Sequence, residues 1–190
     1  MTGPAVSGER ALRGLVRAAP GLTVLTGGQT GVDTYAALAA LRVGLAVHLV
    51  FPHGYRQEDG PLTAGRSRRL RGATLHELSS PSFRYRTWTC AYLADAVLLL
   101  DPAGGAGCRE TARAATSLGR PLLRDRSGAL AEAQTADWLA GVSPRVLMVA
   151  GCRASVLASK GKGRGLRTEL AGIMAGARQY HDGLIAATDG

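Results

Sequence analysis

The stretch that decides the fold is LTVLTGGQTGVD, residues 22–33. An apolar run, Leu22 to Leu25, is followed by a glycine-containing turn and then by an Ala/Leu-rich pattern with helical period. The first backbone N–H groups of a helix have no partners within it and lie at the positive end of its dipole. Glycines let a phosphate approach these groups, although such a turn also favours glycine for its backbone angles alone. The stretch predicts a strand, a turn suited to an anion, and a helix.

Short apolar runs alternate with helical patterns along the chain, which is typical of a parallel sheet with crossover helices. The predicted strands are 22–25, 46–51, 73–78, 96–100, 121–123 and 145–149, and the predicted helices are 7–19, 32–42, 82–94, 108–118, 129–140 and 166–180. In helix 7–19, one apolar face is formed by Leu12, Leu15, Val16 and Ala19. We expect an α/β fold: a doubly wound, mostly parallel Rossmann-like sheet with helices on both faces. It would form a single domain over residues 1–190, with an N-terminal helix in 1–20, a core in 21–180 and a tail in 181–190.

Two segments between these elements have no clear periodicity. In residues 52–71 the sequence EDGP is followed by four arginines, and residues 159–167 read SKGKGRGLR. Both are typical of solvated, mobile loops, and the alternative is that they close over an anionic ligand. In sheets of this class the ligand lies beyond the carboxyl ends of the strands, where the strand order reverses. If strands 22–25 and 96–100 are neighbours, their glycine-rich loops face each other there.

The composition restricts the class of partner. The net charge of +9 favours anionic ligands. Only Lys160 and Lys162 among the 23 basic residues are lysines, and Ala and Gly are abundant, so a GC-rich coding bias accounts for part of this charge. The sequence has no recognition-helix, finger or basic-zipper pattern and few aromatic residues, which argues against nucleic acid. No run approaches the ~20 apolar residues of a membrane span, so no membrane partner is expected.

The cysteines are Cys90, Cys108 and Cys152. An odd number without a CxxC or His/Cys motif predicts neither a disulfide framework nor a structural zinc site. We therefore expect a reducing, cytoplasmic location and no directly bound metal. Cys108 begins a helix after a glycine-rich turn, where a thiol pKa can be depressed. No base can be placed beside it, so a packing role is the simpler interpretation.

Five motifs, in this order, resemble the proteins named molybdenum cofactor carriers. The motifs are GGQTGVD at 27–33, EDGP at 58–61, YRT at 85–87, DA at 95–96 before an apolar strand, and VAG at 149–151 followed by RAS at 153–155. These proteins belong to a Rossmann-like group that includes the cytokinin-activating, Lonely Guy type phosphoribohydrolases. The resemblance extends from Thr23 to the helix near Ala175, and its first two motifs together are fairly specific.

The resemblance implies a pocket at the sheet end and a homo-oligomer, either a dimer or a tetramer. The ligand would be the molybdenum cofactor, a related phosphorylated pterin or a nucleotide. Arg86 would hold its phosphate through two parallel hydrogen bonds; the simpler interpretation is a salt bridge on a helix surface. The cofactor-binding residues carried over by position are Gly27, Gly28, Gln29, Thr30, Gly31, Asp33, Arg86, Thr87, Gly104, Gly105, Gly107 and Thr111.

The chain also departs from the pattern of these relatives. Cys90 stands where they usually have Asn, and Cys108 where they have Thr. The phosphoribohydrolases have a catalytic Glu four residues after the last glycine of the second turn. Here that position is Thr111, and Glu110 lies one residue earlier, rotated by about 100° around the helix.

The sequence leaves two main functions open, with a nucleotide-sensing module as a more distant third. The preferred hypothesis is a protein that binds a phosphorylated cofactor or nucleotide without converting it. The alternative is a phosphoribohydrolase-like N-glycosidase that releases base and ribose 5-phosphate from a nucleoside monophosphate. Such a reaction needs a carboxylate to stabilise the positive charge on the sugar and to orient water. The candidates for it are Asp33, Glu58, Asp59 and Glu110. For Asp33, in the first turn of its helix, complementing the helix dipole is a sufficient simpler role.

Overall fold

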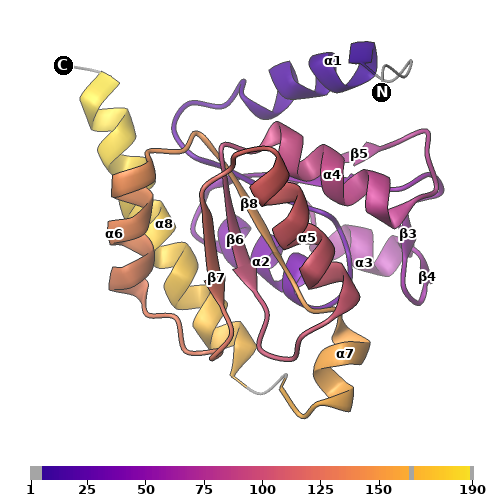
Figure 1. Cartoon of the computed structure of the whole chain (residues 1–190). Coiled ribbons are helices and arrows are strands. Elements are labelled where there is room, and N and C mark those ends of the chain that lie inside the picture. The colour runs from indigo at the N-terminus through magenta and orange to yellow at the C-terminus, as the bar shows by residue number, and fades with distance from the viewer. Residues whose placement is uncertain (1–5, 163–164, 189–190) are drawn as a thin grey trace.

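A computed structural model describes residues 6–162 and 165–188. Its main sheet is formed by β1 (Thr23–Thr26), β2 (Ala46–Phe51), β5 (Thr74–Glu77), β6 (Ala96–Leu100), β7 (Leu122–Asp125) and β8 (Val146–Gly151). The strand order is β5-β2-β1-β8-β6-β7 (Figure 1). Every neighbouring pair in this sheet is parallel, which confirms the predicted parallel sheet.

Helices cover both faces of the sheet. They are α1 (Val6–Val16), α2 (Val32–Arg42), α4 (Phe83–Leu93), α5 (Ala106–Ser117), α6 (Glu132–Val142) and α8 (Leu166–Thr188). On one face α2 packs on β1, β2 and β8, with α8 against α2 and α6 against α8. On the other face α4 and α5 pack together over the sheet, and α1 lies against α4 (Figure 1). This arrangement confirms the doubly wound α/β fold. Within the described ranges, none of the helices has the length and hydropathy needed to cross a membrane.

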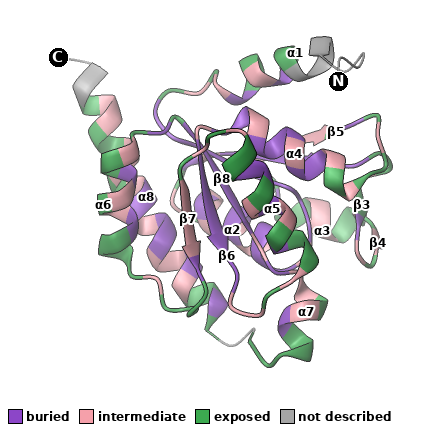
Figure 2. Cartoon of the chain, viewed as in Figure 1, coloured by how far each residue is buried: buried purple, intermediate pink, exposed green. Residues whose placement is uncertain are grey.

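The central strands form the core of the molecule. All five residues of β6 are buried, and so are the first five of β8 (Figure 2). Polar and apolar residues do not alternate along such strands, because helices cover both faces of the sheet. Burying one Leu side chain stabilises the fold by about 1.5–3 kcal/mol. The continuous apolar runs in the sequence therefore correspond to the strands at the centre of the sheet.

The structure shows that the strands 22–25 and 96–100, which were considered as neighbours, are not adjacent in the sheet. β1 and β6 are not adjacent, because β8 pairs with both of them. The last strand of the chain returns to the middle of the sheet, and each of its two neighbours comes from a different half of the sequence. The loops after β1 and β6 therefore face a common region with the β8 loop between them.

The expectation of an irregular loop at 52–71 is wrong. This segment contains β3 (Arg56–Gln57) and β4 (Gly60–Pro61), which form an antiparallel hairpin, followed by α3 (Ala64–Arg69). The turn residue Gly60 has φ +119°, a backbone conformation that favours glycine. The side-chain oxygen of Thr63 accepts a hydrogen bond from Arg66 N and so caps α3.

Two other expectations need adjustment. Residues 159–167 begin at the end of α7 (Ala154–Ser159) and finish within α8, but 163–164 lie outside the described residues. On α1, Leu12 and Val16 are buried whereas Leu15 is 57% exposed. The apolar face of α1 is therefore narrower than predicted, because the helix ends at Val16, before Ala19, and packs against α4 with Leu15 turned to the surface.

A stacked histidine pair makes the fold sensitive to acid. His48 on β2 and His76 on the adjacent β5 lie with their ring centroids 5.1 Å apart, and Nδ1 of His48 is 2.8 Å from Nε2 of His76. Burial, followed by the charge of His76, lowers the pKa of His48 from 6.5 to about 4. Burial also lowers the pKa of His76. Protonation of the folded pair is therefore unfavourable.

We expect the pair to reduce stability as the pH falls from 6.5 to about 4, because in this window the unfolded chain binds a proton that the folded chain does not. One such proton changes the unfolding free energy by at most about 1.4 kcal/mol per pH unit. Urea unfolding across this window should show a smaller pH dependence for His48→Asn than for the parent. His53→Asn, at an exposed histidine, is the control. Equal pH dependence in the parent and His48→Asn would contradict the prediction.

Candidate functional site

A cavity of about 250 Å³ lies at the carboxyl edge of the sheet, between the end of β8 and helices α4 and α5; we call it the sheet-end cavity. Its lining residues are Gln29, Asp33, Phe83, Arg84, Arg86, Thr87, Ala106, Gly107, Glu110, Thr111, Met148, Ala150, Gly151 and Arg153. They come from segments far apart in the sequence, and the sheet topology places them together. This is the region where the strand order reverses, at which ligands of such sheets bind.

Arg86 and Asp33 form a buried ion pair in the wall of this cavity. Ser82 caps α4 by accepting a hydrogen bond from Tyr85 N, which fixes the first turn of the helix next to Arg86. Nη1 of Arg86 lies 3.2 Å from Oδ2 of Asp33, and the two side chains are 8% and 4% exposed. Burial raises the pKa of Asp33, and the Arg86 charge offsets only part of this effect. Nε of Arg86 is buried without a hydrogen-bond partner among the described residues.

Two glycines of the first turn make room for neighbouring side chains. A Cβ atom at Gly27 would lie 1.1 Å from Nη1 of Arg86, so the guanidinium occupies the space over this glycine. Gly28 has φ +65°, and a Cβ there would lie 2.5 Å from Cε1 of Phe51. Glycine is therefore required at both positions by packing within the protein.

The backbone N–H groups of the first turn have acceptors inside the protein. Gln29 N donates to Oδ2 of Asp33 over 3.3 Å, and Thr30 N donates to Oε1 of Gln29 over 3.0 Å. Val32 N donates to the carbonyl oxygen of Cys152 over 3.1 Å. An anion at this turn would have to replace these acceptors.

The second glycine turn differs from the first. The N-cap of α5 is Gly105, and no side-chain hydrogen bond caps this end of the helix among the described residues. Ala106 and Gly107, at the start of α5, line the sheet-end cavity. Gly104 has φ +64° and open space where a Cβ would be. The positive end of the α5 dipole therefore faces the cavity and provides favourable potential for an anion.

Glu110 is a candidate catalytic carboxylate that lines this cavity together with Asp33. Trp88 Nε1 donates to Oε1 of Glu110 over 2.6 Å, and Arg84 Nε donates to the same oxygen over 2.9 Å. The Trp88 hydrogen bond is the main interaction that lowers the pKa of Glu110, which keeps the carboxylate ionised. Thr111 also lines the cavity, and its hydroxyl donates to the carbonyl oxygen of Gly107.

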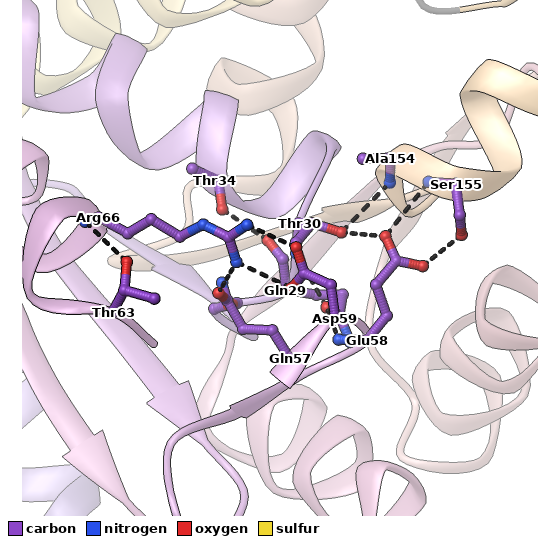
Figure 3. A network of polar contacts seen from close by, with 11 residues as sticks. Gln29, Thr30, Thr34, Gln57, Glu58, Asp59, Thr63, Arg66, Ala154 and Ser155 are labelled. Carbon is purple, nitrogen blue, oxygen red and sulfur yellow. Dashed lines mark hydrogen bonds and ion pairs between the residues drawn. The ribbon is translucent and has the colours of Figure 1, made fainter. Parts of the chain in front are cut away.

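Glu58 lies in a different polar network, which joins the β3-β4 hairpin to α7 (Figure 3). Its carboxylate accepts hydrogen bonds from the hydroxyls of Thr30 and Ser155 and from Ser155 N at 3.2 Å. Burial alone would raise the pKa of Glu58, but the hydrogen bonds from Ser155 and Thr30 outweigh it and lower the pKa. Glu58 therefore connects the hairpin to the first glycine turn and to the start of α7.

Asp59 faces away from the sheet-end cavity. It forms a bidentate ion pair with Arg66, with Nη1 2.8 Å from Oδ1 (Figure 3). The hydrogen bonds from Arg66 lower the pKa of Asp59. Arg66 also donates to Oε1 of Gln57, so this cluster fixes α3 against the hairpin.

A second cavity, of about 390 Å³, lies between α2, α3, α8 and the hairpin; we call it the helix-side cavity. Its lining residues are Thr30, Gly31, Thr34, Tyr35, Leu38, Ala39, Arg42, Val43, Gln57, Asp59, Leu62, Arg66, Arg69, Leu70, Ala154, Arg167 and Ala171. The guanidinium of Arg167 lies 4.8 Å from the ring centroid of Tyr35, and Arg66 is paired with Asp59. These cations are thus already engaged by the protein.

The structure divides the predicted site residues into three groups. In the sheet-end cavity it brings together Gln29, Asp33, Arg86, Thr87, Gly107, Glu110 and Thr111. The helix-side cavity contains Thr30, Gly31 and Asp59. Gly27, Gly28, Glu58, Gly104 and Gly105 line neither of these cavities.

Sequence reasoning missed two arginines of the sheet-end cavity, Arg84 and Arg153. Arg84 precedes Arg86 by two residues, and Arg153 follows β8 within the RAS motif. The position of Arg153 directly after a strand at the sheet centre is a signal that could have indicated it.

The model of the circularly permutated YpsA SLOG family matches residues 24–162. The chain belongs to this family. One similar solved structure is a "Putative molybdenum carrier protein" from Syntrophus aciditrophicus SB, with 21% sequence identity and a TM-score of 0.67. The match covers 83% of this chain and 96% of that one. These findings confirm the family resemblance and the Rossmann-like fold.

A second solved structure comes from work on EarP-mediated arginine glycosylation of translation elongation factor EF-P. It is 16% identical, and the match covers 96% of this chain and 63% of that one. Its TM-score is 0.36, too low to support an argument about this family member. No curated protein matches the chain.

Proposed function

We propose that this family member binds the phosphate group of a small phosphorylated ligand in the sheet-end cavity. The observation that carries the proposal is that the start of α5, without a side-chain cap among the described residues, lines the same cavity as Arg153. Arg84 and Arg86 add positive charge to this cavity, although each is also paired with a carboxylate. A helix N-terminus offers backbone N–H groups to an anion, and arginine adds charge-assisted hydrogen bonds. The helix N-terminus and the arginines together favour a small group with high negative charge, such as a phosphate.

The cavity dimensions and walls suit part of such a ligand. Its volume of about 250 Å³ is slightly below the range of about 300–1,000 Å³ that encloses a drug-sized molecule. Phe83 lines the wall, and the guanidinium groups of Arg56 and Arg153 lie 5.5 Å and 5.9 Å from its ring centroid. A planar pterin or base would stack on this ring in place of one of them. The residues therefore fit the phosphate and an adjoining ring of a molybdenum cofactor, a related phosphorylated pterin or a nucleotide, and we propose this ligand class. The name of the solved molybdenum carrier supports the first of these.

Glu110 favours the N-glycosidase as the second candidate function. Glu110 and Asp33 both line the proposed phosphate site, but Asp33 is buried against Arg86 with a raised pKa, whereas the lowered pKa of Glu110 keeps it charged. An ionised carboxylate near the phosphate could stabilise positive charge on a ribose. Its two oxygens are engaged by Trp88, Arg84 and Arg113, which supports binding over hydrolysis.

Calorimetric titration with inorganic phosphate, pyrophosphate and AMP tests the binding proposal. We expect saturable binding that Arg153→Gln weakens by about 10-fold to 100-fold, the size of one lost hydrogen bond to a charged group. Arg69→Gln removes an exposed arginine of the helix-side cavity and is the matched control. Absence of binding to all three probes, or equal loss in both variants, would refute the proposal.

Incubation with AMP separates the two functions. A binding protein leaves AMP intact. Release of free adenine and ribose 5-phosphate that disappears in Glu110→Gln but persists in Glu58→Gln would assign the protein as a hydrolase. Glu58→Gln is an informative comparison because Glu58 lies outside the sheet-end cavity.

A further inference from the structure

Asp101, Cys108 and Cys152 come together from three segments next to the sheet-end cavity. Asp101 follows β6 and Cys152 follows β8, two strands that are neighbours in the sheet, while Cys108 lies in the first turn of α5. The three residues are 4%, 2% and 2% exposed. We propose that they bind a thiophilic divalent metal ion of the zinc class. This proposal does not depend on the phosphate site.

The spacing of the three ligand atoms matches one face of a tetrahedral site. Sγ of Cys108 is 3.5 Å from Sγ of Cys152, and Sγ of Cys152 is 3.5 Å from Oδ1 of Asp101. All three atoms lie within 4.8 Å of one another. Zinc bonds of about 2.3 Å to sulfur and about 2.0–2.2 Å to oxygen place tetrahedral ligands about 3.5–3.8 Å apart. An ion can therefore be accommodated with little movement of the side chains.

The same distance distinguishes a metal site from a disulfide. A disulfide requires a sulfur separation of about 2.05 Å, so the two sulfurs would have to approach by about 1.5 Å. Cys108 is fixed by α5 and Cys152 by the end of β8, both packed in the core. Two buried sulfurs at this separation, with a carboxylate oxygen equally close, are better suited to share one cation.

The positive charge of Arg124 makes such a metal site electrically neutral. Its Nε donates to Oδ2 of Asp101 over 3.1 Å, and its Nη2 donates to the same oxygen. Oδ1 therefore remains directed toward Cys152. Two thiolates, one carboxylate, one guanidinium and a divalent cation carry no net charge. This neutrality is what burial demands, because an unbalanced charge inside a protein is costly.

The two thiols lie in hydrogen-bond contact with each other. Metal binding releases their protons, so that both sulfurs become thiolate ligands. Arg124 holds the carboxylate in place as an outer-shell partner, a role that typically contributes about 10–100-fold to metal affinity.

The positions of the three residues in the sequence explain why sequence reasoning did not find this cluster. Cys108 and Cys152 are 44 residues apart and belong to no CxxC motif. Asp101 precedes Cys108 by seven residues, across the loop that joins β6 to α5. Three protein ligands leave a fourth tetrahedral position, as in zinc sites that accept a further ligand.

Titration of the reduced, metal-free full chain with Co²⁺ tests the proposal, since Co²⁺ replaces zinc and reports thiolate ligation by absorption. We expect one equivalent of Co²⁺ to produce sulfur-to-cobalt bands in the near ultraviolet, and Zn²⁺ to abolish them. Cys108→Ser and Cys152→Ser should each weaken binding by more than the about 10–100-fold expected for Arg124→Gln. Cys90→Ala removes the cysteine outside the cluster and should leave the bands unchanged.

Thermal unfolding with and without Zn²⁺ gives a second readout that does not depend on colour. Zn²⁺ should raise the unfolding midpoint of the parent and of Cys90→Ala, but not that of Cys152→Ser. Folding of each variant is checked by circular dichroism in the absence of metal. Absence of thiolate bands in the parent, or bands that survive in both cluster variants, would overturn the proposal. So would loss of two free thiols on mild oxidation in a chain that binds no Co²⁺, because the pair would then be a redox dithiol.

Discussion

Replacing Arg86 by methionine is expected to lower the free energy of unfolding by about 3–5 kcal/mol, the cost of removing one partner of a buried ion pair. Asp33 is 3% exposed, and Arg86 is the cation that pairs with it. Methionine fills much of the same volume but leaves the carboxylate without its counter-ion. Urea denaturation of the parent and the variant at neutral pH measures the loss.

Arg84→Met is the matched control, because Arg84 lies on the same helix and also pairs with a carboxylate, Glu110. Its side chain is 67% exposed, and an exposed pair contributes only about 0–1 kcal/mol. A loss in Arg86→Met no larger than that in Arg84→Met would contradict the prediction.

The pH dependence of Arg86→Met provides a further check. Burial already raises the pKa of Asp33, and without the opposing charge of Arg86 the pKa rises further. A carboxyl whose folded pKa lies above its unfolded value gains stability as the pH falls through the folded pKa. Part of the stability lost in Arg86→Met should therefore return in acid, and Asp33→Asn in the same chain should restore part of it at neutral pH.

The sequence predicts the main elements because their signals are local. The Ala96–Leu100 run is apolar throughout and becomes a buried central strand, and the helix predicted at 32–42 has the same bounds in the structure. Strand order is different, because a parallel pair forms between segments far apart in the chain. Nothing local in Val146–Gly151 indicates that it pairs with both β1 and β6.

The candidate site was only partly predictable for the same reason. Arg86 could be proposed from its motif, but its pairing with Asp33 spans 53 residues and required the fold. The glycine turn at 27–31 was readable as an anion site from helix-start physics. The structure adds that Asp33, Gln29 and the Cys152 carbonyl oxygen accept hydrogen bonds from this turn.

Short helices and hairpins between the main elements were missed where composition resembled a loop. The segment 52–71 is rich in charge and contains Gly60 and Pro61, which are common in loops. Its elements are defined by contacts with distant residues, such as the hydrogen bond from Gln57 Nε2 to the carbonyl oxygen of Gly28. Such contacts have no counterpart in local propensity.

Gly31→Ala is expected to lower the free energy of unfolding by about 2–5 kcal/mol. Gly31 has φ +80°, a conformation that costs a residue with a side chain about 1–2 kcal/mol. A Cβ would also lie 2.5 Å from the carbonyl oxygen of Cys152 and 2.6 Å from Ala154 N. These are backbone atoms, so relief requires movement of the start of α2 away from the β8 loop, at a further cost of about 1–3 kcal/mol.

Gly104→Ala separates the two contributions. Gly104 has φ +64°, close to that of Gly31, but a Cβ there meets nothing within 4 Å. It should therefore lose only the conformational part, about 1–2 kcal/mol. Urea unfolding of both variants measures the difference, which isolates the close approach of the first glycine turn to the loop after β8. If the two variants lose equal free energy of unfolding, the close approach at Gly31 adds nothing to the cost of the substitution. A larger loss at Gly31 means that this turn and the loop bearing Cys152 hold each other in place, and Gly31→Ala should then also weaken Co²⁺ binding, whereas Gly104→Ala should not.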